Sequence, residues 1–366
     1  MQGATHQGTT GHPCQKAPNA QALRQCNEVH PQCLNCERHE IACSFSAPSL
    51  TTTPLHDDSF ADLELLDHWH RWRSTSANAL LPSRESENDA IRLGFSHHYL
   101  LNSILAFAAL QLFNEDRSQT RWYVRAVAHR QAAIARARPH LQNLQELQHL
   151  ALLNFSFYTS IYALAEPLVR APTTGCLHSA FDPVKELLQA IRLGRSSAVF
   201  VQQHLASAVS SNQAFVGKYG TGPLKAVQGL EFAFPQLVSL QRFIESQCEG
   251  WERSVCLRAA ELLSASFACL VKNPDGSAQT RATWGWASHV DSAYLDLCFA
   301  QNTVALVIFA HFAALLSLSR GSWYLRSWPP LLLRHIRSLL KDGLEESIRW
   351  PEETVFGKRL TLLSTA

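Results

Sequence analysis

The chain has 366 residues, of which 46% are hydrophobic and 17% are charged, and its formal net charge at pH 7 is +2. This length fits one large domain or two, with enough apolar material for a buried core. The nearly neutral charge excludes a protein whose whole surface is basic enough to bind nucleic acid.

The first 13 residues are rich in Gly, Gln, Thr and His, and we predict that they are disordered. They contain no apolar stretch typical of a secretory signal. Five of the ten cysteines lie within the first 43 residues: Cys14, Cys26, Cys33, Cys36 and Cys43. Crowded cysteines indicate metal binding in an intracellular protein and disulfides in a secreted one, so the missing signal favours zinc.

The last four of these cysteines are separated by six, two and six residues. Thiolates at such short spacings can converge on one tetrahedral Zn²⁺ ion. We therefore predict a zinc site made by Cys26, Cys33, Cys36 and Cys43, with Cys14 as a further candidate ligand. The alternative, unrelated cysteines in a disordered tail, is less favoured because the spacing is specific.

The segment around these cysteines resembles the second two-thirds of the fungal Zn2Cys6 binuclear-cluster finger, whose pattern is C-x2-C-x6-C, a loop, and C-x2-C-x6-C. Cys26, Cys33, Cys36 and Cys43 match its third to sixth cysteines, and the loop N-E-V-H-P-Q and the tail N-C-E-R-H also match. The resemblance implies a nuclear regulator of RNA polymerase II genes that reads DNA through a short basic helix in the major groove.

The first third of the family pattern is missing from residues 14–45. Its first two cysteines fall on Lys16 and Asn19, and its basic run contains one cation, Arg24. Residues 1–50 hold three cations and three anions, whereas DNA affinity depends on cations that neutralise phosphates. We predict a degenerate finger whose DNA binding, through Arg24 and Lys16, is weak or lost. A decayed finger and a misplaced exon boundary before Cys26 both explain the departure.

Residues 46–58 are a Ser/Thr/Pro-rich linker, and residues 59–356 are predicted to form an all-α domain, followed by a tail at 357–366. Asp57, Asp58 and Ser59 offer caps for a first helix in which Phe60 to Trp72 recur at helical spacing. No segment alternates with a period of two, and no Asn-Gly or Asp-Gly turn joins two such segments.

The later helices are predicted from apolar periodicity and from capping residues. One helix is predicted to begin after Ser96 as its cap, and another after Ser118, ending near Pro139. Three more are predicted at residues 147–165, from Asp182-Pro183 to Gly194, and at residues 296–318. Ser254 is the predicted cap of a helix at residues 255–271. Residues 147–165 and 296–318 are strongly apolar, but polar residues interrupt them. We therefore expect buried core helices and no membrane span.

This helical part resembles the regulatory domain of fungal transcription factors of the sterol uptake control type. The matching motifs are F-A-D-L-E-L-L-D-H-W-H at 60–70, G-F-S-H-H-Y-L-L-N-S-I-L-A-F-A-A-L at 94–110, the Tyr123/His129 region, 305–316, W-Y-L-R-S-W at 323–328 and I-R-W-P at 348–351. They occur in order, after a finger in the expected place. The resemblance implies a domain that binds a sterol-like apolar ligand and controls activity in the nucleus.

No catalytic motif is found, so we expect no enzyme. The glycine-rich residues 217–222 are interpreted as a loop. Cys248, Cys256, Cys269 and Cys298 lack close partners and are interpreted as small core residues, as is His311. Six arginines between Arg117 and Arg138, with no acid before Glu146, indicate a solvated helix face or, less favoured, a second nucleic-acid surface.

Two hypotheses follow from the sequence. The first is a zinc-cluster transcription regulator with an incomplete finger. The second is a DNA-binding-deficient paralogue that senses a ligand or binds proteins through its helical domain. Because the linker is too short for a coiled coil, any homodimer or co-regulator contact is expected to use the helical domain.

Overall fold

The computed structural model describes residue 38 and residues 57–75, 84–143, 148–171, 181–204, 234–272, 283, 285–318, 322–340 and 343–357. The fold is all-α, as predicted, and none of these residues lies in a strand. The elements in chain order are α2 (Asp57–Thr75), α3 (Arg84–Ser96), α4 (His98–Glu115), α5 (Thr120–Gln142), α6 (His149–Arg170), α7 (Pro183–His204), α11 (Pro235–Gln247), α12 (Gly250–Lys272), α14 (Ser292–Phe299), α15 (Thr303–Ser317), α16 (Trp323–Arg326), α17 (Trp328–Leu339), the 3-10 helix η2 (Glu345–Ile348) and α18 (Arg349–Phe356).

The chain divides into two compact units, residues 1–64 and residues 65–366. In the first unit the structure describes Arg38, which is exposed, and the first turns of α2, where Phe60 and Leu63 are each 56% exposed. The second unit contains the rest of α2 and the described helices from α3 to α18. The predicted finger at 14–45 lies outside the described residues, apart from Arg38.

In the second unit, α4 packs against α3, α5 and α6. Its residues Ile104 to Gln111 are all buried, because alanines alternate with large apolar side chains and let the neighbouring helices approach. Phe107 of α4 is the centre of an aromatic cluster. Its ring lies 6.1 Å from that of Trp69 and 5.5 Å from that of Tyr324, measured between ring centroids. Edge-to-face arrangements of this kind stabilise aromatic pairs.

The C-terminal helices of this unit surround α15, in which every residue from Val304 to Leu316 is buried. Helices α12, α14, α17 and α18 all contact it. Trp286 stacks on Phe312 with a centroid distance of 4.1 Å, and the Tyr294 hydroxyl donates a hydrogen bond to the carbonyl oxygen of Ala305 at 3.0 Å. Because α15 is apolar on all sides, it is stable only where neighbours enclose it.

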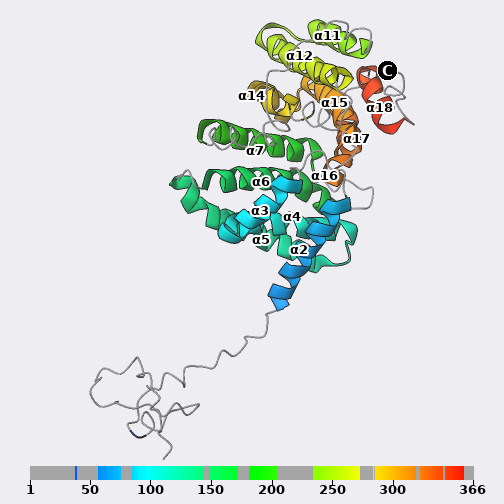
Figure 1. The fold of residues 1–366 in the computed structure, drawn as a ribbon. Helices are drawn as coiled ribbons and strands as arrows, with labels where there is room; N and C mark the ends of the chain where they lie inside the picture. Colours follow the sequence, from blue (N-terminus) through cyan, green and yellow to red (C-terminus); the bar gives the residue numbers. More distant parts are fainter. Residues whose placement is uncertain are drawn as a thin grey trace, which may run out of the picture. The chain divides into compact units, whose positions relative to one another are not determined.

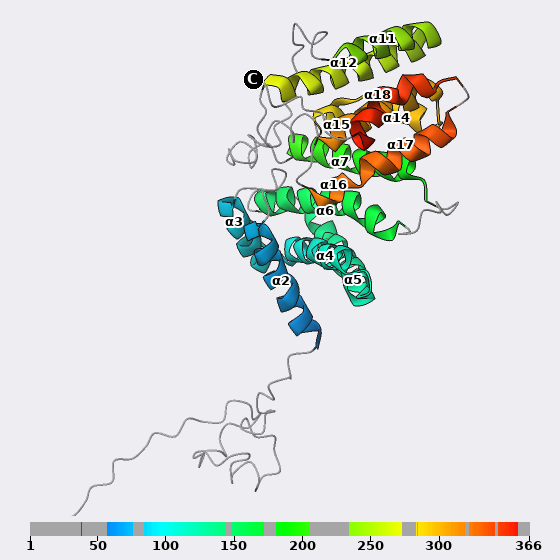
Figure 2. The ribbon, with the colours of Figure 1, turned by 90° about the vertical axis from the view of Figure 1, so that its right-hand side faces the viewer.

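Helix α7 lies between α6 and the C-terminal helices, as Figures 1 and 2 show. The Arg192 guanidinium of α7 binds the carboxylate of Asp296 in α14. The indole of Trp328 in α17 donates a hydrogen bond to the carbonyl oxygen of Leu164 in α6 at 3.1 Å. Side chains that are far apart in the sequence therefore join α7 to α14 and α17 to α6 within this unit.

The predicted helix starts are partly confirmed. The carboxylate of Asp182 accepts hydrogen bonds from the backbone amides of Val184 and Lys185, each at 3.1 Å, so it caps α7 as expected. Ser96 and Ser118 do not cap their helices: α4 begins after His97 and α5 after Gln119, and neither has a side-chain cap bond. The Ser118 hydroxyl donates to Asp116 instead.

The predicted helix ends fail in two places. Helix α7 continues through Gly194 to His204, whereas α5 ends at Gln142, near Pro139 as predicted. The helix expected at 296–318 is two helices, because α14 ends at Phe299 and α15 begins at Thr303. At this corner Gln301 has a φ of 56°, and the Asn302 side chain accepts a hydrogen bond from the amide of Ala305. The Asn302 cap starts a new helix at this point.

Within the described ranges, no single helix is long and apolar enough to cross a membrane. Helices α14 and α15 pass that test of length and composition only as a pair, and they are bent by 106° relative to each other.

Candidate functional site

The predicted zinc ligands Cys14, Cys26, Cys33, Cys36 and Cys43 and the predicted DNA contacts Lys16 and Arg24 all lie outside the described residues. Their prediction therefore stands on the sequence. Elsewhere, in the described part of the chain, no group of three or more His, Cys, Asp or Glu side chains could hold a metal ion.

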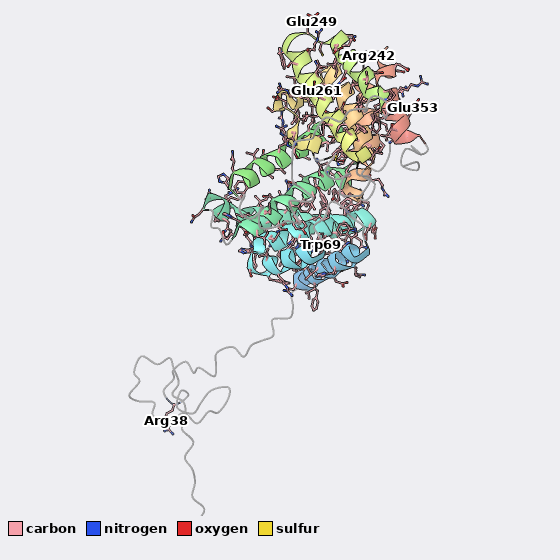
Figure 3. The ribbon with its side chains drawn as sticks, turned by 45° about the horizontal axis from the view of Figure 1, so that its top comes forward. Arg38, Trp69, Arg242, Glu249, Glu261 and Glu353 are labelled. Atoms are coloured by element: carbon pink, nitrogen blue, oxygen red, sulfur yellow. The ribbon has the colours of Figure 1, made fainter. Side chains whose placement is uncertain are left out.

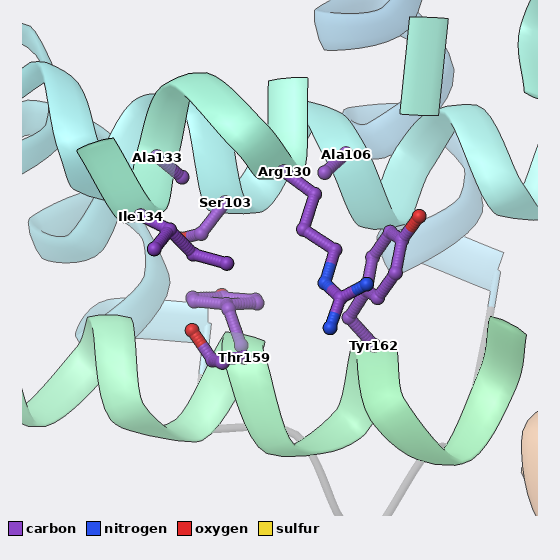
Figure 4. Close-up of a pocket in the computed structure, with 8 residues that line it drawn as sticks. Ser103, Ala106, Arg130, Ala133, Ile134, Thr159 and Tyr162 are labelled. Carbon is purple, nitrogen blue, oxygen red and sulfur yellow. The ribbon is translucent and has the colours of Figure 1, made fainter. Parts of the chain in front are cut away.

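A crevice between α4, α5 and α6 is a candidate site formed by described helices (Figure 4). Its cavity volume is about 10 Å³, room for roughly one water molecule. Polar atoms reach it from each helix. The lining residues are Ser103 and Ala106 of α4, Arg130, Ala133 and Ile134 of α5, and Tyr158, Thr159 and Tyr162 of α6.

Arg130 and Tyr162 close one side of this crevice. Figure 4 shows the Arg130 side chain extending from α5 toward the Tyr162 ring on α6. The guanidinium carbon lies 5.1 Å from the ring centroid, within the range of a cation–π interaction. Burial raises the pKa of Tyr162 well above its usual value, so this phenol stays protonated at neutral pH. Its hydroxyl has no hydrogen-bond partner among the residues that the structure describes.

An ion-pair network adjoins the crevice and joins α5, α6 and α7. The Tyr123 hydroxyl donates a hydrogen bond to the Glu166 carboxylate at 2.8 Å, and the Arg170 guanidinium lies 3.2 Å from the same carboxylate oxygen. Arg170 also binds Glu186 of α7 at 2.8 Å. Desolvation and then the hydrogen bond to Glu166 raise the pKa of Tyr123. Tyr123 and Tyr162 therefore act as neutral groups, and the network holds α5, α6 and α7 in register.

This arrangement suits structural support more than chemistry. Among the lining residues of the crevice, no His, Asp, Glu or Cys side chain could act as a base for the hydroxyls of Ser103 and Thr159. The crevice is also far too small for a sterol-sized ligand, which needs a pocket of several hundred cubic ångströms. The sequence identified the arginines of this region but not their tyrosine partners, because the pairing of Arg130 with Tyr162 depends on how α5 packs on α6.

Two other buried groups were interpreted as core residues from the sequence. His311 is confirmed as one: its Nδ1 lies 2.9 Å from the carbonyl oxygen of Val307, and burial lowers its pKa to about 4. Cys256 is fully buried, and burial raises its pKa to about 12. Cys256 is a free cysteine in the core, as expected, and its thiol lies near that of Cys248, which is also free and buried. Thiols held in the protonated form are poor nucleophiles.

The predicted arginine-rich face lies mainly on α5. Arg121, Arg136 and Arg138 are exposed, whereas Arg117 is half-buried. The Arg117 guanidinium donates hydrogen bonds to the carbonyl oxygens of Leu168 and Val169. These carbonyls belong to the last turn of α6, where backbone acceptors lack helical partners. Arg117 is therefore a structural residue, and the exposed arginines are left as candidates for partner binding.

No family model, no curated protein and no solved structure matches this chain.

Proposed function

We propose that the chain is a fungal zinc-cluster transcription regulator of the sterol uptake control type, acting in the nucleus with a DNA-binding finger that is impaired. The helical unit would be its regulatory domain. The proposal rests on the cysteine spacing at Cys26 to Cys43 and on the ordered motifs that follow it.

One observation supports the proposal most directly: the motifs that resemble the family meet in space. Trp69 comes from the first motif, Phe107 from the second, and Trp323 and Tyr324 from a motif more than 200 residues later. The Phe107 ring contacts all three of the others, with centroid distances between 5.5 and 6.1 Å. Residues that build one common core are expected to be kept together in a family of the same fold.

A second pair of motifs also converges. His311 lies in the motif at 305–316 and Trp350 in the motif at 348–351, and their ring centroids are 5.6 Å apart. Trp350 in turn packs on Phe267 of α12. The two convergences use different helices, so they support the assignment of the helical unit independently of each other.

Zinc content tests the finger. The experiment is elemental analysis of the reduced, full-length protein, with Cys33→Ser as the variant and Cys269→Ser, outside the finger, as the matched control. We expect about one zinc per chain, because four thiolates complete one tetrahedral site. It should be lost in Cys33→Ser and retained in Cys269→Ser. Two zinc ions would mean that Cys14 and a further ligand complete a binuclear cluster. No zinc would overturn the finger.

DNA binding separates the two hypotheses made from the sequence. Residues 1–50 have no net charge, so few phosphates can be neutralised and the salt dependence of binding should be shallow. Affinity for duplex DNA would be measured at several salt concentrations for the wild type and for Arg24→Ala. A steep dependence of affinity on salt concentration that becomes shallower in Arg24→Ala would favour a regulator that binds DNA.

The second candidate function is a DNA-binding-deficient paralogue that senses a ligand or binds a co-regulator or a second copy through the helical unit. The neutral first 50 residues favour it. The crevice between α4, α5 and α6 is too small for a sterol-like ligand. A sterol that raised the thermal midpoint of the purified protein at micromolar concentration would support the ligand-sensing form.

A further inference from the structure

Two buried thiols meet where α11 and α12 join. Cys248 follows the last residue of α11, and Cys256 lies in the second turn of α12. Both cysteines are free, they expose 3% and 0% of their surfaces, and their thiols lie near each other. A lone buried cysteine acts as a small core residue, whereas two neighbouring thiols can be joined by a covalent bond.

Arg253 fixes how the two helices meet. Its guanidinium donates hydrogen bonds to the carbonyl oxygen of Cys248 at 2.7 Å and to that of Glu245 at 3.0 Å, both at the end of α11. Arg253 and Cys256 are three residues apart on α12, so they share one face of that helix. The face of α12 that binds the end of α11 is therefore the face that carries Cys256.

The two thiols differ in how near they lie to solvent. Gln247 and Glu249, on either side of Cys248, are exposed. Figures 1 and 2 show α11 and α12 side by side at one end of the second unit, and Figure 3 shows Glu249 at the edge of that end. A small local movement is therefore enough to expose Cys248, whereas Cys256 lies deeper.

The surroundings of the two thiols also differ in charge. Burial raises the pKa of both, and it raises that of Cys256 to about 12. At Cys248 the carboxylate of Glu252 adds to the increase in pKa, and the Cys256 thiol and the Arg253 guanidinium oppose it. Because the thiolate is the attacking species, Cys248 is better suited than Cys256 to react first.

We propose that Cys248 and Cys256 are a site of reversible disulfide formation, with a small disulfide such as glutathione disulfide as the oxidant. The Cys248 thiolate attacks one sulfur of the oxidant, whose S–S bond breaks, and the first glutathione leaves as a thiolate that takes up a proton. Cys256 then loses its proton, and its sulfur attacks the Cys248 sulfur and releases the second glutathione. Two protein thiols are oxidised, and one glutathione disulfide is reduced to two glutathiones.

A third buried thiol, that of Cys298, has other partners. It lies 3.8 Å from the carbonyl oxygen of Ala305 and also interacts with the side chain of Tyr294. Cys248 is therefore the expected partner of Cys256. A disulfide also suits this apolar site better than a metal ion held by two thiolates, because the disulfide buries no charge.

The test uses the folded, full-length protein, incubated with glutathione disulfide, alkylated and digested with trypsin. Cleavage after Arg242, Arg253 and Arg258 places Cys248 in the peptide 243–253 and Cys256 in the peptide 254–258. We expect mass spectrometry to find these two peptides joined, with the loss of two hydrogen atoms, and dithiothreitol to separate them. The predicted zinc ligands lie in other tryptic peptides, so failure of the zinc site and failure of this pair are distinguishable.

Single alanine variants test the order of the two steps. In Cys256→Ala the second step is impossible, so one glutathione should stay attached to the peptide 243–253. In Cys248→Ala the peptide 254–258 should gain glutathione at least about tenfold more slowly, because Cys256 is buried in its protonated form. Cys298→Ala is the matched control and should still form the joined peptides. Circular dichroism establishes that each variant is folded, and the wild-type measurement needs no variant.

Three outcomes would overturn the proposal. The first is a wild-type protein in which the peptides 243–253 and 254–258 stay separate. The second is a bond from Cys256 to Cys298, which would assign the disulfide to another pair. The third is glutathione attachment at equal rates in Cys248→Ala and Cys256→Ala, which would mean that the thiols react from an unfolded chain and that the α11–α12 corner does not direct them.

Discussion

Trp328 and Leu164 are joined by a hydrogen bond across 164 positions of the sequence: the indole Nε1 donates to the carbonyl oxygen at 3.1 Å. The Trp328 side chain is fully buried. This bond therefore connects α17 to α6 in the interior, where an indole N–H without an acceptor would be costly.

Replacing Trp328 tests this connection. Trp328→Phe removes the donor and part of the buried volume, so we expect the free energy of unfolding to fall by about 1–3 kcal/mol. Trp251→Phe is the matched control, because Trp251 is 64% exposed, and it should change stability by less than about 0.5 kcal/mol. Urea denaturation followed by circular dichroism measures both. Equal midpoints for the two variants would contradict the role given to Trp328.

Phe107 should be among the most sensitive positions in the molecule. It is fully buried and contacts aromatic rings from α2 and α16, so Phe107→Ala leaves a cavity that its neighbours fill incompletely. We expect a loss of about 3–5 kcal/mol. Phe95→Ala, at a position that is 58% exposed, is the control and should be nearly neutral. The measurement is the denaturation midpoint together with tryptophan emission, which should shift to longer wavelength only in Phe107→Ala.

His311 predicts how stability depends on pH. Its pKa is lowered by burial from 6.5 to about 4. Between these values the unfolded chain binds a proton at this position and the folded chain does not, so His311 makes the free energy of unfolding fall as pH decreases. The slope from this residue alone is about 1.4 kcal/mol per pH unit.

The difference between wild type and His311→Gln isolates this contribution. Denaturation midpoints measured from about pH 7 to about pH 4.5 should fall more steeply in the wild type than in the variant. The same pH dependence in both proteins would show that His311 is not buried in its neutral form.

Gln301 occupies a backbone conformation that favours glycine. Its φ of 56° is in the left-handed region, at the corner between α14 and α15. Gln301 is exposed, so its side chain contributes little packing. We expect Gln301→Gly to leave the protein equally stable or to stabilise it by up to about 1 kcal/mol. Asn302→Ala at the adjacent cap should instead destabilise it by about 1–2 kcal/mol. Thermal unfolding of both variants measures these two changes in stability, which should differ in sign.

The helix class was predictable because the apolar periodicity is strong, and the Asp182 cap was predictable because Asp followed by Pro is a specific start signal. Gly194 was misread as an end signal. A Cβ at this position would meet no atom within 4 Å, and buried residues before it, such as Leu188 and Ile191, hold the helix in place. Tertiary packing therefore outweighs the modest cost of one glycine inside a helix.

The corner at Gln301 and Asn302 was missed for a different reason. The apolar pattern continues on both sides of it, and Asn is a cap only if the preceding backbone turns. The candidate crevice could not be predicted either, since Arg130 and Tyr162 are 32 residues apart on helices whose relative rotation no local pattern specifies. The zinc site at Cys26 to Cys43 lies outside the described residues, so it stays a prediction from the cysteine spacing alone.

The aromatic cluster around Phe107 also has a consequence for biosynthesis. Trp69 and Phe107 emerge from the ribosome long before Trp323 and Tyr324, which complete their packing. Until then the nascent chain exposes a large aromatic surface that is prone to aggregate. We therefore expect a premature stop before residue 323 to give an insoluble product in place of a shorter folded one.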